Sequence, residues 1–216
     1  MNRLFLILCF LVISNISKSQ IKALTENGKE VLLFEDGTWT YSKDSSDSTN
    51  ASKDFLVLNN HLFVKSTGAT FLVKSQIFNV GIFMNPSKWT FSTHRDNEKN
   101  PEYRFSLKSG EGYAVMVTEK TQIEIESLRK IALMNAEKVS ADFKETSAEY
   151  RMVNGKKMIC LRFQGTVQGI KINYIGYYYS NPNGTVQLLC YSSKQYFDSV
   201  QTELERFLNG LVEIEK

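Results

Sequence analysis

The pattern of hydrophobic and polar positions is most regular in the last third of the chain, between Thr146 and Ser192. Runs rich in Val, Ile, Leu, Tyr and Phe are separated there by Asn154-Gly155, Gln168-Gly169 and the Asn-Pro-Asn-Gly sequence at 181–184. Asn-Gly between β-rich runs is a strong hairpin signal, because both turn residues tolerate a positive φ. The pattern predicts a meander of four antiparallel strands joined by three tight turns.

The turns also predict how the strands of this meander pair. If Val167 pairs with Ile170, Cys160 lies opposite Tyr177; if Ser180 pairs with Thr185, Ile175 lies opposite Cys190. Side chains then alternate between two faces. One face carries Ile159, Leu161, Phe163, Tyr174, Tyr178, Leu189 and Tyr191, and the other carries Met158, Cys160, Ile175, Tyr177, Tyr179, Val186, Leu188 and Cys190. Both faces are apolar, so we expect both to be covered; the more polar strand before Val153 should lie nearer an edge.

Two segments carry apolar residues at helical spacing. The first runs from Ser127 to Ala141, and the second follows Ser193, with its stripe at Phe197, Val200, Leu204, Phe207, Leu208 and Leu211. Ser192 or Ser193 would cap the second helix, and Asn209-Gly210 suits its end. These two helices are available to cover the two faces of the meander. We therefore expect an α+β fold, an antiparallel β-sheet with helices on both faces, that is, an α/β/α sandwich.

Further strands are expected before the first helix. The β-like runs are 61–65, 70–74, 80–84, 103–107 and 112–119. Pro86 should end one strand because proline cannot donate to a central ladder, and Trp89 after it is a candidate core anchor.

The first nineteen residues have the form of a secretory signal peptide. Arg3 gives a positive start, an apolar run extends to Ile13, and the small residues Ser17 and Ser19 favour cleavage between Ser19 and Gln20. The apolar run is short for a membrane span, and an uncleaved anchor is the alternative. We therefore expect a secreted or periplasmic protein, with no transmembrane segment after cleavage.

Between the signal peptide and the main domain the sequence predicts two further parts. Residues 20–41 contain two Asn/Asp-Gly turns and read as a small β-meander, too small to be stable by itself. Trp39 and Tyr41 in it are either packing contacts or an exposed aromatic pair that binds sugar or peptide. Residues 42–54 are rich in Ser, Asp and Lys and predict a flexible linker. Residues 55–216 then form the α/β/α domain.

Composition excludes one class of partner. The chain has 26 Lys and Arg against 23 Asp and Glu, a formal charge of +3, and loss of Arg3 and Lys18 with the signal peptide would leave +1. This balance provides no electrostatic basis for binding nucleic acid.

The two cysteines outside the signal peptide, Cys160 and Cys190, would lie in a compartment that permits disulfides. The expected register places a strand between them and separates their strands by about 9.5 Å, too far for a bond that needs Cα atoms within roughly 7 Å. We expect two separate buried thiols.

The order of elements, together with the Gly81, Pro86 and Trp89 stretch and the Gly110 to Tyr113 turn, resembles the PsbP-like superfamily. The resemblance covers residues 55–216. It implies an accessory or binding module that docks on larger proteins and carries no chemistry. No functional residue can be transferred, because no site motif of that superfamily is recognisable.

Few residues suggest catalysis. The chain has two histidines, His61 and His94, and no helical His pair, Cys-x-x-Cys, Gly-x-Ser-x-Gly or phosphate loop. We expect no catalytic, metal or cofactor site, and no enzyme.

Three functions remain open. The first is a secreted or periplasmic non-catalytic module for a protein or envelope component. The second is a binder of small amphiphiles or lipids in a pocket between sheet and helix, with Phe163, Tyr174, Tyr178 and Trp39 as candidate ligand-binding residues. The third is a hydrolase whose site is not recognised. A filled interior with an exposed apolar patch would favour the first function over the second.

Overall fold

The computed structural model describes residues 21–25, 30–34, 37–42, 56–93 and 101–215. The expected signal peptide, most of the expected linker and His94 lie outside these ranges. The described chain forms two compact units, an N-terminal one and a main domain that contains every described residue from 56 onward. The N-terminal unit is an antiparallel sheet of β1 (Ile21–Leu24), β2 (Glu30–Leu33) and β3 (Trp39–Tyr41). Ser42 belongs to it as well, because its amide donates to the Glu30 carbonyl.

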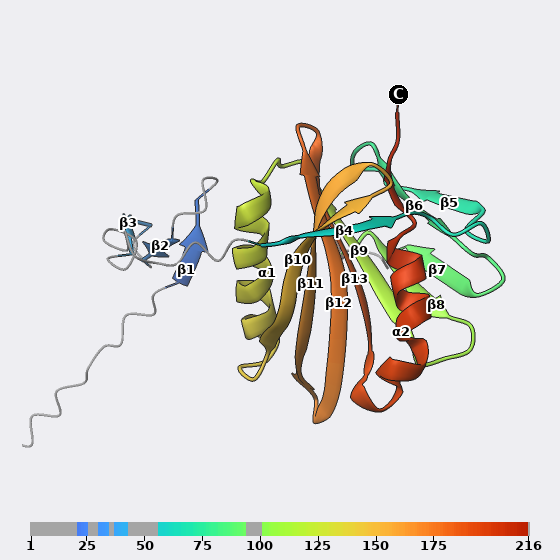
Figure 1. Ribbon diagram of the computed structural model, residues 1–216. Helices are drawn as coiled ribbons and strands as arrows, with labels where there is room; N and C mark the ends of the chain where they lie inside the picture. The colour runs from blue at the N-terminus through green and yellow to red at the C-terminus, as the bar shows by residue number, and fades with distance from the viewer. Residues whose placement is uncertain (1–20, 26–29, 35–36, 43–55, 94–100, 216) are drawn as a thin grey trace, which may run out of the picture. The chain divides into compact units, whose positions relative to one another are not determined.

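The main domain is built on an eight-stranded sheet (Figure 1). Its strands are arranged in the order β4, β10, β11, β12, β13, β9, β8 and β7, with β4 parallel to β10 and the other neighbours antiparallel. The bounds are β4 (Leu58–Phe63), β7 (Trp89–Thr93), β8 (Tyr103–Leu107), β9 (Tyr113–Glu119), β10 (Lys144–Val153), β11 (Lys156–Val167), β12 (Ile170–Asn181) and β13 (Gly184–Ser193).

The predicted pairing of the meander is confirmed throughout. Cys160 lies opposite Tyr177, and Ile175 opposite Cys190. The turn residues Asn154 and Gln168 have φ of 48° and 50°, and the glycine after each is also left-handed. Two successive positive φ values give the turn twist that matches two antiparallel strands, which is why the turn sequences predicted the register.

The two faces of the sheet are covered differently. Helix α1 (Ile125–Val139) packs with Leu128 and Ala132 on Ile159, Leu161 and Tyr178. Helix α2 (Lys194–Leu208) lies over the other face together with a second sheet, made of β14 (Leu211–Glu213), β6 (Val80–Met84) and β5 (Phe71–Lys74) (Figure 1). Trp89 joins this larger core at 1% exposure, stacked on Phe207 with ring centroids 4.1 Å apart.

The expected α/β/α sandwich is therefore wrong. The described residues form fourteen strands in three sheets and only two helices, so the domain is mostly β. Eight strands about 4.8 Å apart are far wider than one helix of about 10 Å, so two helices cannot form complete layers. The β5–β6 hairpin, which has the same pattern as a strand of the main sheet, instead forms part of the cover. Leu211, expected on the second helix, lies in β14, because the chain turns at Asn209 and Gly210.

Candidate functional site

The predicted ligand-binding residues are divided between core and surface. Phe163 and Tyr178 are 5% and 3% exposed and pack under α1 against Leu128, which is fully buried. Tyr174 lies at the border of the same core and is half-buried. Trp39 lies in the N-terminal unit, 55% exposed, in edge-to-face contact with Tyr41. The structure thus brings Phe163, Tyr174 and Tyr178 together in a filled interior, and their role in binding stays a prediction.

Four aromatic rings form a continuous row on the α1 face of the sheet. Tyr113 of β9 stacks on Tyr191 of β13 at 5.6 Å, Tyr191 contacts Tyr174 of β12 at 5.3 Å, and Tyr174 contacts Phe143, before β10, at 5.4 Å. Phe143 reaches this position because Gly165 lacks a side chain; a Cβ there would lie 2.6 Å from the ring. We call these four residues the aromatic row.

The aromatic row borders a part of the sheet that α1 leaves open. Within the described chain, α1 packs on β10, β11 and β12. On the same face of β13 and β9, Leu189, Val115 and Val117 are only partly buried, and Tyr113 is 41% exposed. We call this surface, the aromatic row included, the open face. Sequence reasoning placed Tyr174 and Tyr191 on one face, but it could not add Tyr113, because the β13–β9 pairing joins segments about seventy residues apart.

Tyr174 and Tyr191 of the open face remain uncharged near neutral pH. Burial raises the pKa of Tyr174 to about 12, and it also raises the pKa of Tyr191, against the opposing effect of Arg104. They therefore present an apolar ring with a neutral hydroxyl.

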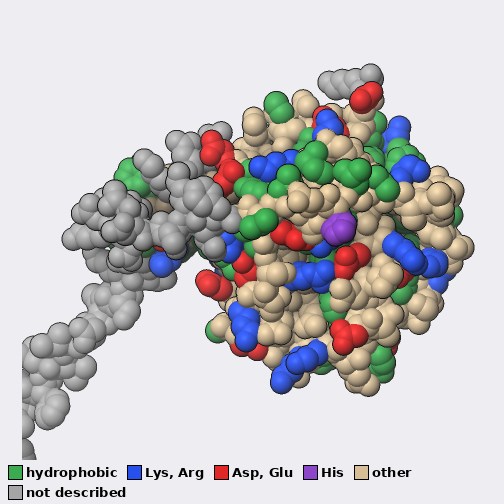
Figure 2. All heavy atoms as spheres, in the orientation of Figure 1, with side chains coloured by type: hydrophobic (Ala, Val, Ile, Leu, Met, Phe, Trp, Pro, Cys, Tyr) green, Lys and Arg blue, Asp and Glu red, His purple; other side chains and the backbone are tan. Residues whose placement is uncertain are grey.

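A second apolar surface follows the edge strand β4 (Figure 2). Val57, Leu62 and Val64 are 75%, 82% and 63% exposed, and β4 pairs on one side only among the described strands. Exposed apolar edge strands are sites of pairing with other chains. His61 is also exposed on this strand, and nothing described around it forms a cleft.

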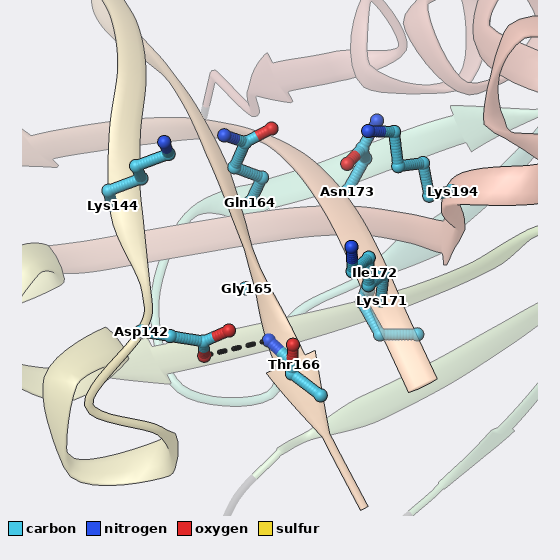
Figure 3. Close-up of a pocket in the computed structure, with 9 residues that line it drawn as sticks. All are labelled: Asp142, Lys144, Gln164, Gly165, Thr166, Lys171, Ile172, Asn173 and Lys194. Atoms are coloured by element: carbon cyan, nitrogen blue, oxygen red, sulfur yellow. Dashed lines mark hydrogen bonds between the residues drawn. The ribbon is translucent and has the colours of Figure 1, made fainter. Parts of the chain in front are cut away.

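A polar hollow of about 280 Å³ lies at the end of the sheet where β11 and β12 meet (Figure 3). Its lining residues come from β10, β11, β12, the start of α2 and the loop after α1: Asp142, Lys144, Gln164, Gly165, Thr166, Lys171, Ile172, Asn173 and Lys194. Lys144 pairs with Gln164, and Gln164 with Asn173, so these side chains form one row across three strands. We call this site the cationic hollow, after its three lysines.

Asp142 is the one acid that lines the cationic hollow. It accepts hydrogen bonds from the Thr166 amide at 2.9 Å and the Ser140 hydroxyl at 2.7 Å. Hydrogen bonding by the Thr166 side chain, and then by Ser140 and the Thr166 amide, lowers the pKa of its carboxyl to about 2, so it stays ionised. Its charge therefore holds the loop after α1 on β11.

Two other hollows differ in their charges. One of about 300 Å³ beside α2 contains Lys88, which pairs with Glu203 at 2.5 Å. Another of about 180 Å³ contains Arg162, which pairs with Glu205 at 2.7 Å. Phe163 and Tyr174 also line the second hollow, together with Phe197, Asp198 and Gln201 of α2. Lys88 and Arg162 are thus each paired with a glutamate, while Lys108, which also lines the first hollow, donates to the Pro86 carbonyl at 2.7 Å.

The described residues contain no group of three or more His, Cys, Asp or Glu side chains that could hold a metal ion. Cys160 and Cys190 are free thiols, as the register predicted. In the part of the chain that the structure describes, no helix combines the length and hydropathy needed to cross a membrane.

Comparison with known proteins adds the fold. No protein-family model matches the chain, and no curated protein matches it in sequence. The solution structure of cyanobacterial PsbP (CyanoP) from Synechocystis sp. PCC 6803 matches it with a TM-score of 0.54 and 9% identity, covering 68% of this chain and 94% of that one. The chain has the PsbP-like fold.

A second similar structure is that of LpqN, which is involved in cell envelope biogenesis of Mycobacterium tuberculosis. It matches the PsbP-like domain with a TM-score of 0.48 and 9% identity, over 67% of this chain and 90% of LpqN. At such identities the likeness concerns the course of the backbone, and roles of side chains must be argued from this chain's own residues.

Proposed function

We propose that the protein is a non-catalytic, extracytoplasmic module that binds a protein partner through the open face. The aromatic row carries this proposal. Tyrosine is enriched in protein interfaces, because its rigid ring buries a large apolar area while its hydroxyl finds a partner. Partly exposed Val115, Val117 and Leu189 beside the row extend the apolar surface.

Several observations support a protein over a small amphiphile as the ligand. An amphiphile needs a concave apolar pocket that encloses most of its surface. The interior under α1 is instead filled, with Leu128, Ile159 and Leu161 fully buried. The open face is the surface of a sheet, which suits an extended contact. The signal-peptide pattern of residues 1–19 supports an extracytoplasmic location.

Position-specific crosslinking in the native envelope tests this proposal. A photo-reactive phenylalanine analogue replaces Tyr113 on the open face, and Tyr196 on α2 in a matched control. The two side chains have nearly equal exposure, 41% and 39%, but lie on opposite sides of the sheet. We expect one discrete crosslinked protein from position 113 and none from 196. Equal labelling at both positions, or none at 113, would contradict the proposal.

A charge substitution provides the second arm. Tyr113→Lys should abolish stoichiometric co-purification of the crosslinked protein, because it places an ammonium group in the apolar contact. Tyr196→Lys makes the same change outside the open face and should leave recovery unchanged. Unfolding midpoints of both variants establish that a loss of recovery reflects binding.

A further inference from the structure

The cationic hollow lies on the α2 face of the sheet, opposite the open face, and its charges are not balanced within the chain. Lys144, Lys171 and Lys194 are exposed at its wall, and none of them forms an ion pair with another described residue. The single acid, Asp142, is already engaged by Thr166 and Ser140. The site therefore has an excess of positive charge.

The start of α2 adds to this excess. Lys194 is the first residue of this fifteen-residue helix, and the first turn contains no acid. Ser193 occupies the N-cap, but its side chain makes no capping hydrogen bond. The first amides of a helix point their N–H groups outward and carry a partial positive charge, which favours anions.

Buried polar atoms beside the hollow also lack a partner. Oδ1 of Asn173 and the hydroxyls of Ser192 and Ser193 are buried and have no hydrogen-bond partner. Ser192 pairs directly with Asn173 across β12 and β13, so both side chains lie on the same face, but Ser192 is fully buried and only Asn173 lines the hollow. Buried polar groups without a partner are rare, because each costs about 1–3 kcal/mol.

Figure 3 shows how these groups are arranged. Lys144, Gln164, Asn173 and Lys194 follow one another across the strands, with Asp142 bonded to Thr166 at the lower rim. Ammonium groups at both ends of a row of side-chain amides, with the first backbone amides of the helix beside it, provide donors to an anion with several oxygens. A phosphate group has this form and fits easily in about 280 Å³.

We propose that the cationic hollow binds a phosphate group, with Lys144, Lys171 and Lys194 as its cations. The phosphate is either a free anion or the ester of a larger molecule, such as a lipid headgroup.

Titration of the isotope-labelled chain from residue 20 onward with inorganic phosphate tests the site. At constant ionic strength, adjusted with sodium chloride, we expect saturable shifts of the backbone amides of residues 194–196 and 166. Glycerol 3-phosphate is titrated in parallel. Tighter binding of the ester identifies a phosphoester as the ligand class, and equal or tighter binding of inorganic phosphate identifies the free anion.

Matched variants decide whether the hollow is responsible. Replacing Lys144, Lys171 and Lys194 together by Gln should raise the phosphate Kd about tenfold or more, since each charge-assisted hydrogen bond is strong. Replacing Lys74, Lys120 and Lys138 by Gln removes equal charge from exposed positions outside the hollow and should leave the Kd within about twofold.

Two results would overturn the proposal. One is the absence of any saturable shift of residues 194–196 up to about tens of millimolar phosphate, a Kd range in which binding free energy is negligible. The other is an equal loss of affinity in both triple variants, which would show a general effect of net charge. Neither result bears on the open face, so failure here is separate from failure of the proposed function.

Discussion

Arg151 and Tyr177 form a buried pair on β10 and β12, in which Arg151 Nη1 donates to the Tyr177 hydroxyl at 3.1 Å. The same hydroxyl donates to Asn209 Oδ1 at 2.7 Å, at the end of α2. The guanidinium also faces Glu205 at 3.6 Å and lies 4.3 Å from the centre of the Phe63 ring. The pair therefore fastens the end of α2 to the sheet. Removing one partner of a buried charge destabilises the fold, because the charge is then left partly uncompensated.

Removal of the hydroxyl should destabilise the fold. Tyr177→Phe should lower the free energy of unfolding by about 1–3 kcal/mol, because it removes the hydrogen-bond partner of Arg151 Nη1 and of Asn209 Oδ1. Urea unfolding followed by tryptophan fluorescence measures this. Tyr196→Phe, at an exposed position, should change it by less than about 0.5 kcal/mol. Equal effects of the two substitutions would show that the buried pair adds no stability.

The turn after α2 should not tolerate a side chain. A Cβ on Gly210 would lie 1.9 Å from the Phe83 carbonyl oxygen, while the Phe83 amide donates to the Gly210 carbonyl at 2.8 Å. Gly210→Ala should cost about 1–3 kcal/mol or more, because the backbone of β6 must move. Gly169→Ala is the comparison: nothing lies near its Cβ, and only its φ of 82° opposes alanine, which costs roughly 1–2 kcal/mol. A thermal shift no larger for Gly210→Ala than for Gly169→Ala would contradict the close approach.

The cysteines should react only in the unfolded chain. Burial raises the pKa of the Cys160 thiol to about 12 and raises that of Cys190 well above its usual value. We expect iodoacetamide at pH 8 to modify neither residue in the native protein. In urea without reductant it should modify both, as measured by mass spectrometry. Because the folded pKa of Cys160 exceeds its unfolded value, its contribution to stability is complete below about pH 8.5 and is lost as the pH rises through about 12. Failure of both Cys160 and Cys190 to be alkylated in urea, as a disulfide between them would cause, would contradict the pairing of β11, β12 and β13.

Asp142 should titrate at unusually low pH. The bonds from Thr166 and Ser140 lower the pKa of its carboxyl to about 2, below an unfolded value of about 3.9. Its contribution to stability is therefore present above about pH 4 and is lost as the pH falls through about 2. NMR titration of the carboxyl carbon measures this pKa, and Ser140→Ala should raise it. A midpoint near 4 in the unsubstituted protein would contradict the hydrogen bonds.

Local patterns predicted the part of the fold that depends on near neighbours. The turn at Gln168-Gly169 determines the pairing of β11 with β12, because a two-residue loop allows one register and alternation then assigns every side chain to a face. The same logic correctly kept Cys160 and Cys190 apart. The first helix has the predicted length but begins two residues earlier, at Ile125.

Membership of a sheet could not be predicted in this way. The strand pattern of Val80 to Met84 is equally compatible with the main sheet and with the second sheet. This strand pairs with Leu211 to Glu213. The sequence pattern of that segment predicts the continuation of a helix, and only the packing of Gly210 on Phe83 shows that the helix has ended. Long-range packing decides which sheet this strand joins. The sandwich prediction was wrong for the same reason, because it was made from local patterns alone.

The sequence by itself determined the four-stranded meander, its two apolar faces and the positions of the helices, because turn chemistry and side-chain alternation act between residues close along the chain. Tertiary structure decided what lies on each face. It placed Tyr113 beside Tyr191 through the β13–β9 pairing. It also placed Lys144 of β10 and Lys194 of α2 around one hollow, through the successive pairing of β10, β11, β12 and β13. Both candidate binding surfaces arise from such distant pairs, which the periodicity of a single segment cannot predict.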